Sequence, residues 1–153
     1  MTKYALVALL LAACADDDPA PSATVRMATP DSLTPDDDRL DDLTITIDYL
    51  DADGDLGGGT AEIHDCRSDT LVTILDIPAI APSDVVDGDS GIKGTLELHV
   101  NDVGATASSA LPAACADLGI DEMAPNEAVF CVILVDTAGH HGTGDCTSAI
   151  VIE

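Results

Sequence analysis

Three aspartates at alternate positions are the residues of this sequence best suited to chemistry. Asp51, Asp53 and Asp55 lie in the stretch DADGDLGGG, between two runs of alternating apolar and polar residues. Calcium binds several hard oxygen ligands, and carboxylates spaced this closely can supply them when the backbone folds tightly around the ion. The glycines of the stretch give the backbone that freedom. The pattern therefore predicts a calcium site in a loop between two strands, with calcium as the cofactor.

The same stretch resembles the D-x-D-x-D calcium loops of EF-hand-like and dockerin-like modules. With Asp51 as the first position, the resemblance places Glu62 at the position that binds calcium through both carboxylate oxygens. Two features depart from that family: Leu56 replaces the usual glycine, and strands rather than helices are expected on either side. The expected affinity is in the weak range of extracellular calcium modules, about 10⁻⁴–10⁻³ M. The alternative is a hairpin turn rich in Asp and Gly that needs no metal.

A second metal hypothesis concerns the histidines. His140 and His141 lie in the loop AGHHGTGD, where they could bind a transition metal together with His64, Asp65 or Asp145. Adjacent histidines on a strand point to opposite faces, so only a loop can bring both to one ion. Two exposed loop histidines without a metal are the simpler interpretation.

The motifs of common enzymes are missing from the sequence. It has no G-x-S-x-G motif and no cysteine that stands out as a free nucleophile. Asp136-Thr137 begins like the D-T-G of aspartic proteases, but Ala138 interrupts the motif and there is no second copy. We therefore do not expect an enzyme.

The first residues predict export. Lys3 precedes an apolar run over residues 4–13 that is too short to cross a bilayer as a stable helix, which is typical of a secretory signal peptide. Leu11-Ala12-Ala13-Cys14 resembles the bacterial lipobox at all four positions. The resemblance implies that residues 1–13 are a signal peptide and that Cys14 carries the acyl chains of a membrane anchor.

Other interpretations of this segment stay open. Ala13-Cys14-Ala15 also fits an A-x-A cleavage site, which would release a secreted protein, and the whole segment could be a buried helix. On the lipobox interpretation, Ala15 stands where inner-membrane lipoproteins of enterobacteria have aspartate. That difference implies an outer-membrane or cell-surface location.

The chain is strongly acidic. It has 29 Asp and Glu against five Lys and Arg among 153 residues, for a net charge of −24. Such a charge repels nucleic acid and anionic lipid head groups, so both are poor partners. Acidic residues and prolines cluster over residues 14–42 without sustained apolar periodicity, which predicts a disordered tether. The alternative for part of this segment is an edge strand over residues 23–27.

From residue 43 onward the pattern is that of an all-β domain. Alternation of apolar and polar residues predicts strands over 43–50, 60–66, 70–77, 92–100, 128–136 and 146–153, with an optional edge strand at 84–87. A short helix is expected within SSALPAACADLG, where Ser109 can cap it, Pro112 suits its first turn and Gly119 its end.

Six or seven strands over residues 43–153 predict a single antiparallel β-sandwich with one short helix, of the immunoglobulin-like or fibronectin type III kind. The last stretch, CVILVDTAGHHGTGDCTSAIVIE, resembles the end of bacterial Ig-like domains, and Asp136 and Gly139 match their D-x-x-G. The resemblance implies the fold and no particular function. An up-and-down barrel and a jelly-roll fragment are the alternatives.

Four cysteines follow Cys14, which in an exported chain implies two disulfides. Three pairings are possible. A strand at 84–87 would bring Cys66 and Cys146 to the same end of the sandwich, which favours Cys66–Cys146 with Cys115–Cys131. Each bridge is expected to contribute about 2–4 kcal/mol.

These observations predict a lipid-anchored cell-envelope β-sandwich that acts as a binding, adhesion or structural module. Its partner would be an unidentified protein or envelope ligand, reached through the loops that join the strands. The leading alternative is a calcium-binding accessory or enzyme-inhibitor domain secreted without a lipid anchor. Lipidation of Cys14 separates the two hypotheses.

Overall fold

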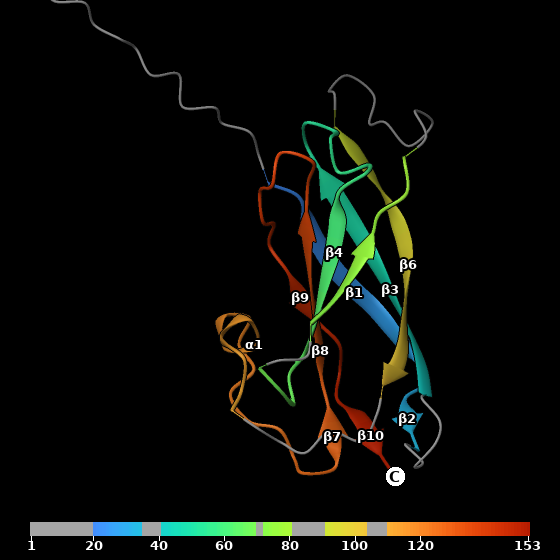
Figure 1. The fold of residues 1–153 in the computed structure, drawn as a ribbon, viewed down its shortest axis with the longest axis vertical. Coiled ribbons are helices and arrows are strands. Elements are labelled where there is room, and N and C mark those ends of the chain that lie inside the picture. Colours follow the sequence, from blue (N-terminus) through green and yellow to red (C-terminus); the bar gives the residue numbers. More distant parts are fainter. Residues whose placement is uncertain (1–19, 35–40, 70–71, 81–90, 104–109) are drawn as a thin grey trace, which may run out of the picture.

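The structure, a computed structural model, describes residues 20–34, 41–69, 72–80, 91–103 and 110–153. These residues form an all-β sandwich with one short helix, as the sequence predicts (Figure 1). The elements are β1 (Ser22–Thr29), β2 (Ser32–Leu33), β3 (Asp41–Asp51), β4 (Thr60–Asp65), β5 (Val72–Asp76), β6 (Ile92–Val103), α1 (Ala113–Asp117), β7 (Glu127–Ala128), β8 (Phe130–Val135), β9 (Asp145–Cys146) and β10 (Ile150–Ile152).

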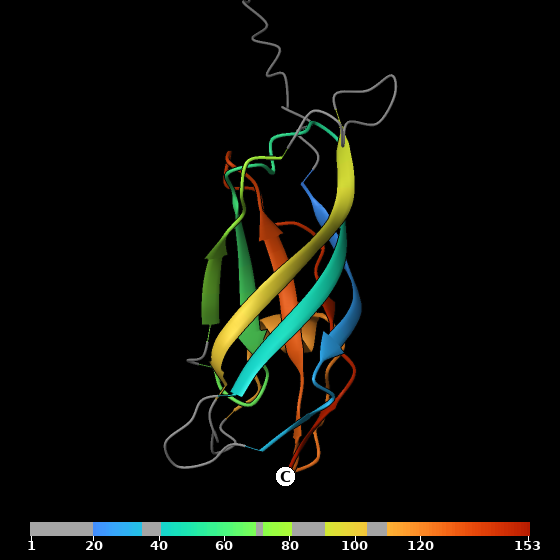
Figure 2. The same ribbon diagram turned by 90° about the vertical axis from the view of Figure 1, so that its right-hand side faces the viewer.

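Two sheets form the layers of the sandwich. One has the order β1-β3-β6 and the other the order β5-β4-β8-β9. Figure 2 shows β3 and β6 crossing in front of β4 and β8. A small sheet of order β2-β10-β7 continues the second layer at the end of the molecule that holds the C-terminus (Figure 1). Among the described strands, β2 and β10 are the one parallel pair.

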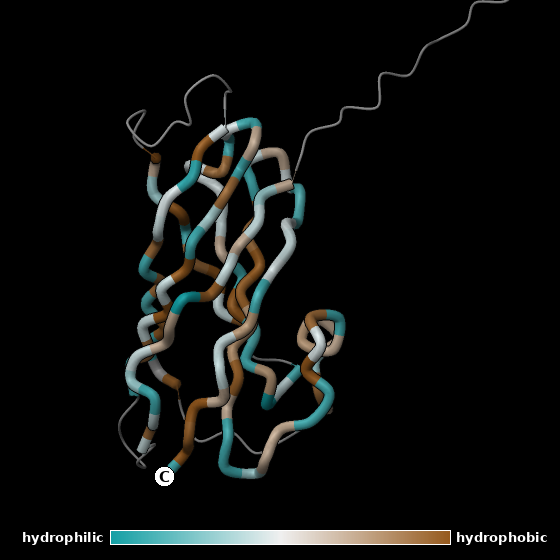
Figure 3. Tube along the Cα trace, turned by 180° about the vertical axis from the view of Figure 1, so that it is seen from behind, coloured by the Kyte–Doolittle hydropathy of each residue, from teal (hydrophilic) through white to brown (hydrophobic). Residues whose placement is uncertain are grey.

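The alternation of side chains along β3 explains how the core forms. Its apolar residues are buried and the polar residues between them lie toward solvent, as a strand with one covered face requires. The alternation is visible along the strands in Figure 3. Aliphatic side chains supply most of the core, which Tyr49 and Phe130 complete. Its largest fully buried apolar side chains are Leu33, Leu43, Ile45, Ile47, Leu56, Ile63, Phe130, Val132, Leu134 and Ile150.

The described strands are more numerous than the six or seven predicted, because two predicted strands are interrupted and two further strands precede residue 43. The strand expected at 128–136 divides into β7 and β8, and the one at 146–153 into β9 and β10. The other two additional strands, β1 and β2, lie before residue 43. The optional strand at 84–87 lies outside the described residues, as do residues 70–71 of the strand expected at 70–77.

The prediction of a disordered tether over residues 14–42 is wrong for the part that the structure describes. β1 pairs antiparallel with β3 and forms an edge of the first sheet, which agrees with the alternative of an edge strand at 23–27. The physical reason is backbone pairing. Ala23 is the one buried apolar residue of β1, so the strand carries little hydrophobic pattern. Residues 14–19 and 35–40 lie outside the described residues.

The helix α1 is shorter than the stretch that predicts it. Pro112 occupies the N-cap position, and Gly119, with φ of 86°, follows the helix end in the left-handed conformation that glycine tolerates. Ser109 lies outside the described residues. Leu111 and Leu118 pack with Cys115 in a small second core on the outside of the β4-β8-β9 sheet. No helix in the described part of the chain is long and apolar enough to cross a membrane.

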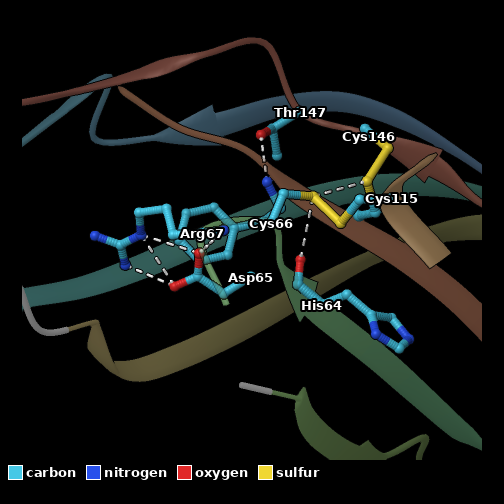
Figure 4. Close-up of a disulfide and its surroundings, with 9 residues drawn as sticks. His64, Asp65, Cys66, Arg67, Cys115, Cys146 and Thr147 are labelled. Atoms are coloured by element: carbon cyan, nitrogen blue, oxygen red, sulfur yellow. Dashed lines mark hydrogen bonds and ion pairs between the residues drawn. A yellow bond between two sulfur atoms is a disulfide. The ribbon is translucent and has the colours of Figure 1, made fainter. Parts of the chain in front are cut away.

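Two disulfides form, but the predicted pairing is wrong. The bonds are Cys66–Cys115 and Cys131–Cys146 (Figure 4). In the antiparallel ladder of β8 and β9, Cys131 lies directly opposite Cys146, and Cys66 at the end of β4 reaches Cys115 on α1. All four cysteines belong to the second core, where the sulfurs of Cys66 and Cys131 are 3.4 Å apart. The strand register, which the sequence does not reveal, therefore decides the pairing.

A buried ion pair lies beside the disulfides. The Arg67 guanidinium donates to Asp65 through Nε at 2.9 Å and through an Nη at 2.6 Å (Figure 4). The guanidinium also lies over the ring of Phe130, at 5.9 Å from its centroid. The carboxylate of Asp65, at the end of β4, therefore binds Arg67.

Candidate metal centre

The three aspartates of the sequence prediction lie where β3 enters the loop to β4. β3 buries every second residue, and Asp51 continues the inward set that includes Ile47 and Tyr49. Strand geometry thus places a carboxylate in the interior, with 0% of Asp51 exposed. Burying a charged group is costly unless hydrogen bonds, an opposite charge or a metal compensates.

The structure brings the three carboxylates together around one point. Oxygens of Asp51, Asp53 and Asp55 lie within 4.8 Å of one another. One oxygen of Asp51, Oδ2, accepts a hydrogen bond from the Leu56 N–H at 2.8 Å. The Oδ1 atoms of all three aspartates are buried and have no hydrogen-bond partner within the described part of the chain. Three buried acceptors that lack donors are the arrangement that a hard cation would satisfy.

The electrostatics of the cluster also favour a cation. Burial raises the pKa of the Asp55 carboxyl, and the neighbouring carboxylates of Asp136, Asp53 and Asp51 raise it further. A hydrogen bond from the Thr137 hydroxyl, at 2.9 Å, acts against this rise. The net upward shift means that the ionised form of Asp55 is disfavoured, and a divalent cation would offset both its burial and the repulsion from its neighbours.

The loop after Asp55 has a local reason for departing from the EF-hand-like pattern. Leu56 is fully buried and belongs to the main core, so this position anchors the loop instead of forming its sharp turn. Two nearby glycines allow the loop to turn instead: Gly54 and Gly58 have φ of 87° and 92°, in the left-handed region that glycine tolerates. At Gly59 the backbone passes so close to β8 that a Cβ would lie 2.2 Å from the Val135 carbonyl oxygen. The loop is therefore fixed against both layers.

Glu62, the fourth predicted calcium ligand, does not join the three aspartates. It lies on β4, and its carboxylate faces His64 Nε2 at 3.6 Å and His141 Nδ1 at 3.7 Å. The prediction is wrong because it counted positions along a helix-flanked loop, whereas β4 holds Glu62 on the outer face of a sheet. The candidate calcium site therefore consists of Asp51, Asp53 and Asp55.

Sequence reasoning missed the second buried carboxylate at this end of the sandwich. Asp136 follows β8 directly, and its Oδ1 accepts a hydrogen bond from the backbone N–H of His140 at 2.8 Å. Its other oxygen, Oδ2, lies 3.0 Å from the His140 ring Nδ1. Burial acts to raise the pKa of Asp136, but these hydrogen bonds and the nearby imidazole outweigh it and lower the pKa. Gly139, with φ of 90°, closes the turn between them. The D-x-x-G pattern followed by histidine was the signal that could have revealed this turn.

Replacing Asp136 with alanine is expected to cost about 2 kcal/mol of unfolding free energy at neutral pH, because charge-assisted hydrogen bonds are lost. Since folding lowers the pKa of Asp136 below its ordinary 3.8, its contribution is present above that value and disappears as the pH falls through the lowered pKa. Urea unfolding at pH 7 and near pH 2 should show the two proteins converging in acid. A difference that persists unchanged at low pH would contradict this role.

His140 and His141 do not share one metal position. The His140 ring lies at Asp136, while His141 lies at Glu62, so the adjacent rings serve different carboxylates. Asp145 accepts hydrogen bonds from the Val25 and Cys146 N–H groups.

Comparison with protein-family models, with curated proteins and with solved structures found no match for this chain.

Proposed function

We propose that this chain is a calcium-stabilised β-sandwich module of the cell envelope, held there by a lipid anchor on Cys14. The observation that carries the calcium part is the group of three buried Oδ1 atoms on Asp51, Asp53 and Asp55 that lack hydrogen-bond donors. Carboxylate oxygens are the ligands that calcium prefers, and backbone carbonyls and water can complete its coordination in a loop of this kind.

Calcium would act by ordering the loops at one end of the sandwich. Asp55 accepts the hydrogen bond of Thr137, so the candidate site connects the loop after β3 with the loop after β8. In Figure 1 both loops lie at the end opposite the C-terminus. An ion there would neutralise the carboxylates and fix the two loops relative to each other. Loops held by a rigid β scaffold are where binding proteins usually carry their recognition residues.

The proposed role is binding, adhesion or structure rather than catalysis. Two disulfides support an extracytoplasmic setting, since such bonds persist in oxidising compartments. The net charge of −24 disfavours nucleic acid as the partner. The lipobox resemblance supports the anchor and the outer-membrane or cell-surface location, although residues 1–19 lie outside the described part of the chain.

Cys14→Ala is expected to abolish incorporation of labelled palmitate and to move the protein from the detergent phase to the aqueous phase, because the acyl chains alone attach it to the membrane. Expression in a bacterium with lipoprotein processing, followed by Triton X-114 partitioning, measures both properties. Thr2→Ala is a matched control that leaves the lipobox intact. If wild type is unlabelled and appears in the medium, the protein is a secreted domain, which is the alternative function.

A further inference from the structure

A second group of metal-binding side chains lies on the outer face of the β5-β4-β8-β9 sheet. Glu62 and His64 are two residues apart on β4. Ile63 between them faces the core, so the side chains of Glu62 and His64 share the outer face. His141 comes from the loop after β8 and forms a bridge with Val135. The face thus brings together two imidazoles and one carboxylate from segments far apart in the sequence.

The three side chains converge on one carboxylate oxygen. Glu62 Oε2 lies 3.6 Å from His64 Nε2 and 3.7 Å from His141 Nδ1. Around a tetrahedral zinc ion with bonds of about 2.0–2.2 Å, neighbouring ligand atoms are separated by about 3.3–3.6 Å. Both distances to the carboxylate are therefore close to those of a zinc site. Glu62 Oε2, His64 Nε2 and His141 Nδ1 do not all lie within 4.8 Å of one another. Since both distances to Oε2 are shorter than that, the two nitrogens must be more than 4.8 Å apart.

The surroundings of His64 favour a ligand. Its side chain is only 14% exposed, and its buried Nε2 makes no hydrogen bond with the described residues, since Glu62 Oε2 lies 3.6 Å away. Across the sheet, His64 pairs with Val72 and Glu62 with Ile74 and Ile133, so apolar side chains border the group.

We propose that Glu62, His64 and His141 bind a divalent transition-metal ion of the zinc class. His141 is 59% exposed, which leaves its ring room to turn toward His64 and close the triad. Two imidazoles and one carboxylate make a three-ligand zinc site whose fourth position is open to water or to a donor from a partner. The ion would fasten the loop after β8 to β4. This proposal is independent of the calcium site.

Isothermal titration of zinc chloride into the oxidised full-length chain tests the proposal, with millimolar calcium present to occupy the aspartate loop. We expect one zinc per chain, and affinity at least about tenfold weaker in His141→Ala and in Glu62→Gln, since even residues that only orient a ligand change affinity by about 10–100-fold. His141→Ala changes a surface side chain, so its folding is not at risk.

The control variants separate this site from others. His99→Ala removes a histidine of the other sheet, where His99 lies beside Thr44, and should leave zinc affinity unchanged. Asp51→Asn should also leave it unchanged. Any of three results would overturn the proposal: no zinc binding by wild type at about 1 mM, an unchanged affinity in His141→Ala, or loss of binding in Asp51→Asn. Glu62 would then only form ion pairs with His64 and His141.

Discussion

Calcium at about 10 mM is expected to raise the thermal unfolding midpoint of the oxidised full-length chain by about 5–10 °C. With an affinity of about 10⁻⁴–10⁻³ M, mass action stabilises the folded state by about 1.4–2.7 kcal/mol. For a domain of this size each kcal/mol corresponds to a shift of about 3–4 °C. Differential scanning calorimetry with calcium, and then with excess chelator, measures the effect.

Asp51→Asn should abolish the calcium response and yet leave the chelated protein at least as stable as wild type. The asparagine carbonyl oxygen can still accept the hydrogen bond of Leu56, while one of three clustered negative charges disappears. Loss of the calcium effect without loss of stability would identify Asp51 as a ligand, because a purely structural residue would lower both.

Asp76→Asn is the matched control for this experiment. It removes one negative charge from an exposed position on β5 and should retain the full calcium shift. An equal shift in wild type and Asp51→Asn would locate calcium elsewhere on the acidic surface. No shift in wild type would reduce DADGD to a turn rich in Asp and Gly.

The strands that could be predicted from the sequence are those whose burial is one-sided. Along β3 and β4 every second side chain is buried, and this period of two appears directly in the order of residues. The same period could have predicted the burial of Asp51, which continues the inward positions of Ile47 and Tyr49. The aspartate cluster was therefore accessible from the sequence, including its most buried member.

The failed predictions concern features that depend on which strands become neighbours. The Cys131–Cys146 bond follows from the β8–β9 register, and the place of Glu62 follows from β4 lying beside β8. Neither register leaves a signal in local composition. β1 was missed for a related reason, since its half-buried side chains and flanking prolines resemble a tether while its backbone completes a sheet.

Deleting residues 1–42 is expected to destroy the cooperative fold, because it removes both β1 and β2. The first sheet would then consist of β3 and β6 alone, and a two-stranded layer is marginally stable. The deletion also removes Leu33, which is 1% exposed and whose burial contributes about 1.5–3 kcal/mol. Against a typical stability of about 5–15 kcal/mol, the loss of strand pairing and core together is large.

The second layer would be damaged by the same deletion. β1 and the residue before it connect the two layers: the Ala23 N–H donates to the Thr143 carbonyl at 2.9 Å, and the Thr143 N–H donates to the Pro21 carbonyl at 3.0 Å. The carboxylate of Asp145 would also lose the N–H of Val25. Deletion therefore leaves polar groups of the loop before β9 without their partners.

A chain that begins at Ala20 is the control, since it keeps every described element of the fold. It should give dispersed amide resonances and a single urea transition, whereas residues 43–153 alone should give collapsed resonances and a broad transition. Leu33→Ala in the control chain should lower the unfolding free energy by about 2–5 kcal/mol. A truncated chain that unfolds like the control would mean that β1 and β2 only rest on a domain complete without them, so that the tether would extend to residue 42 after all.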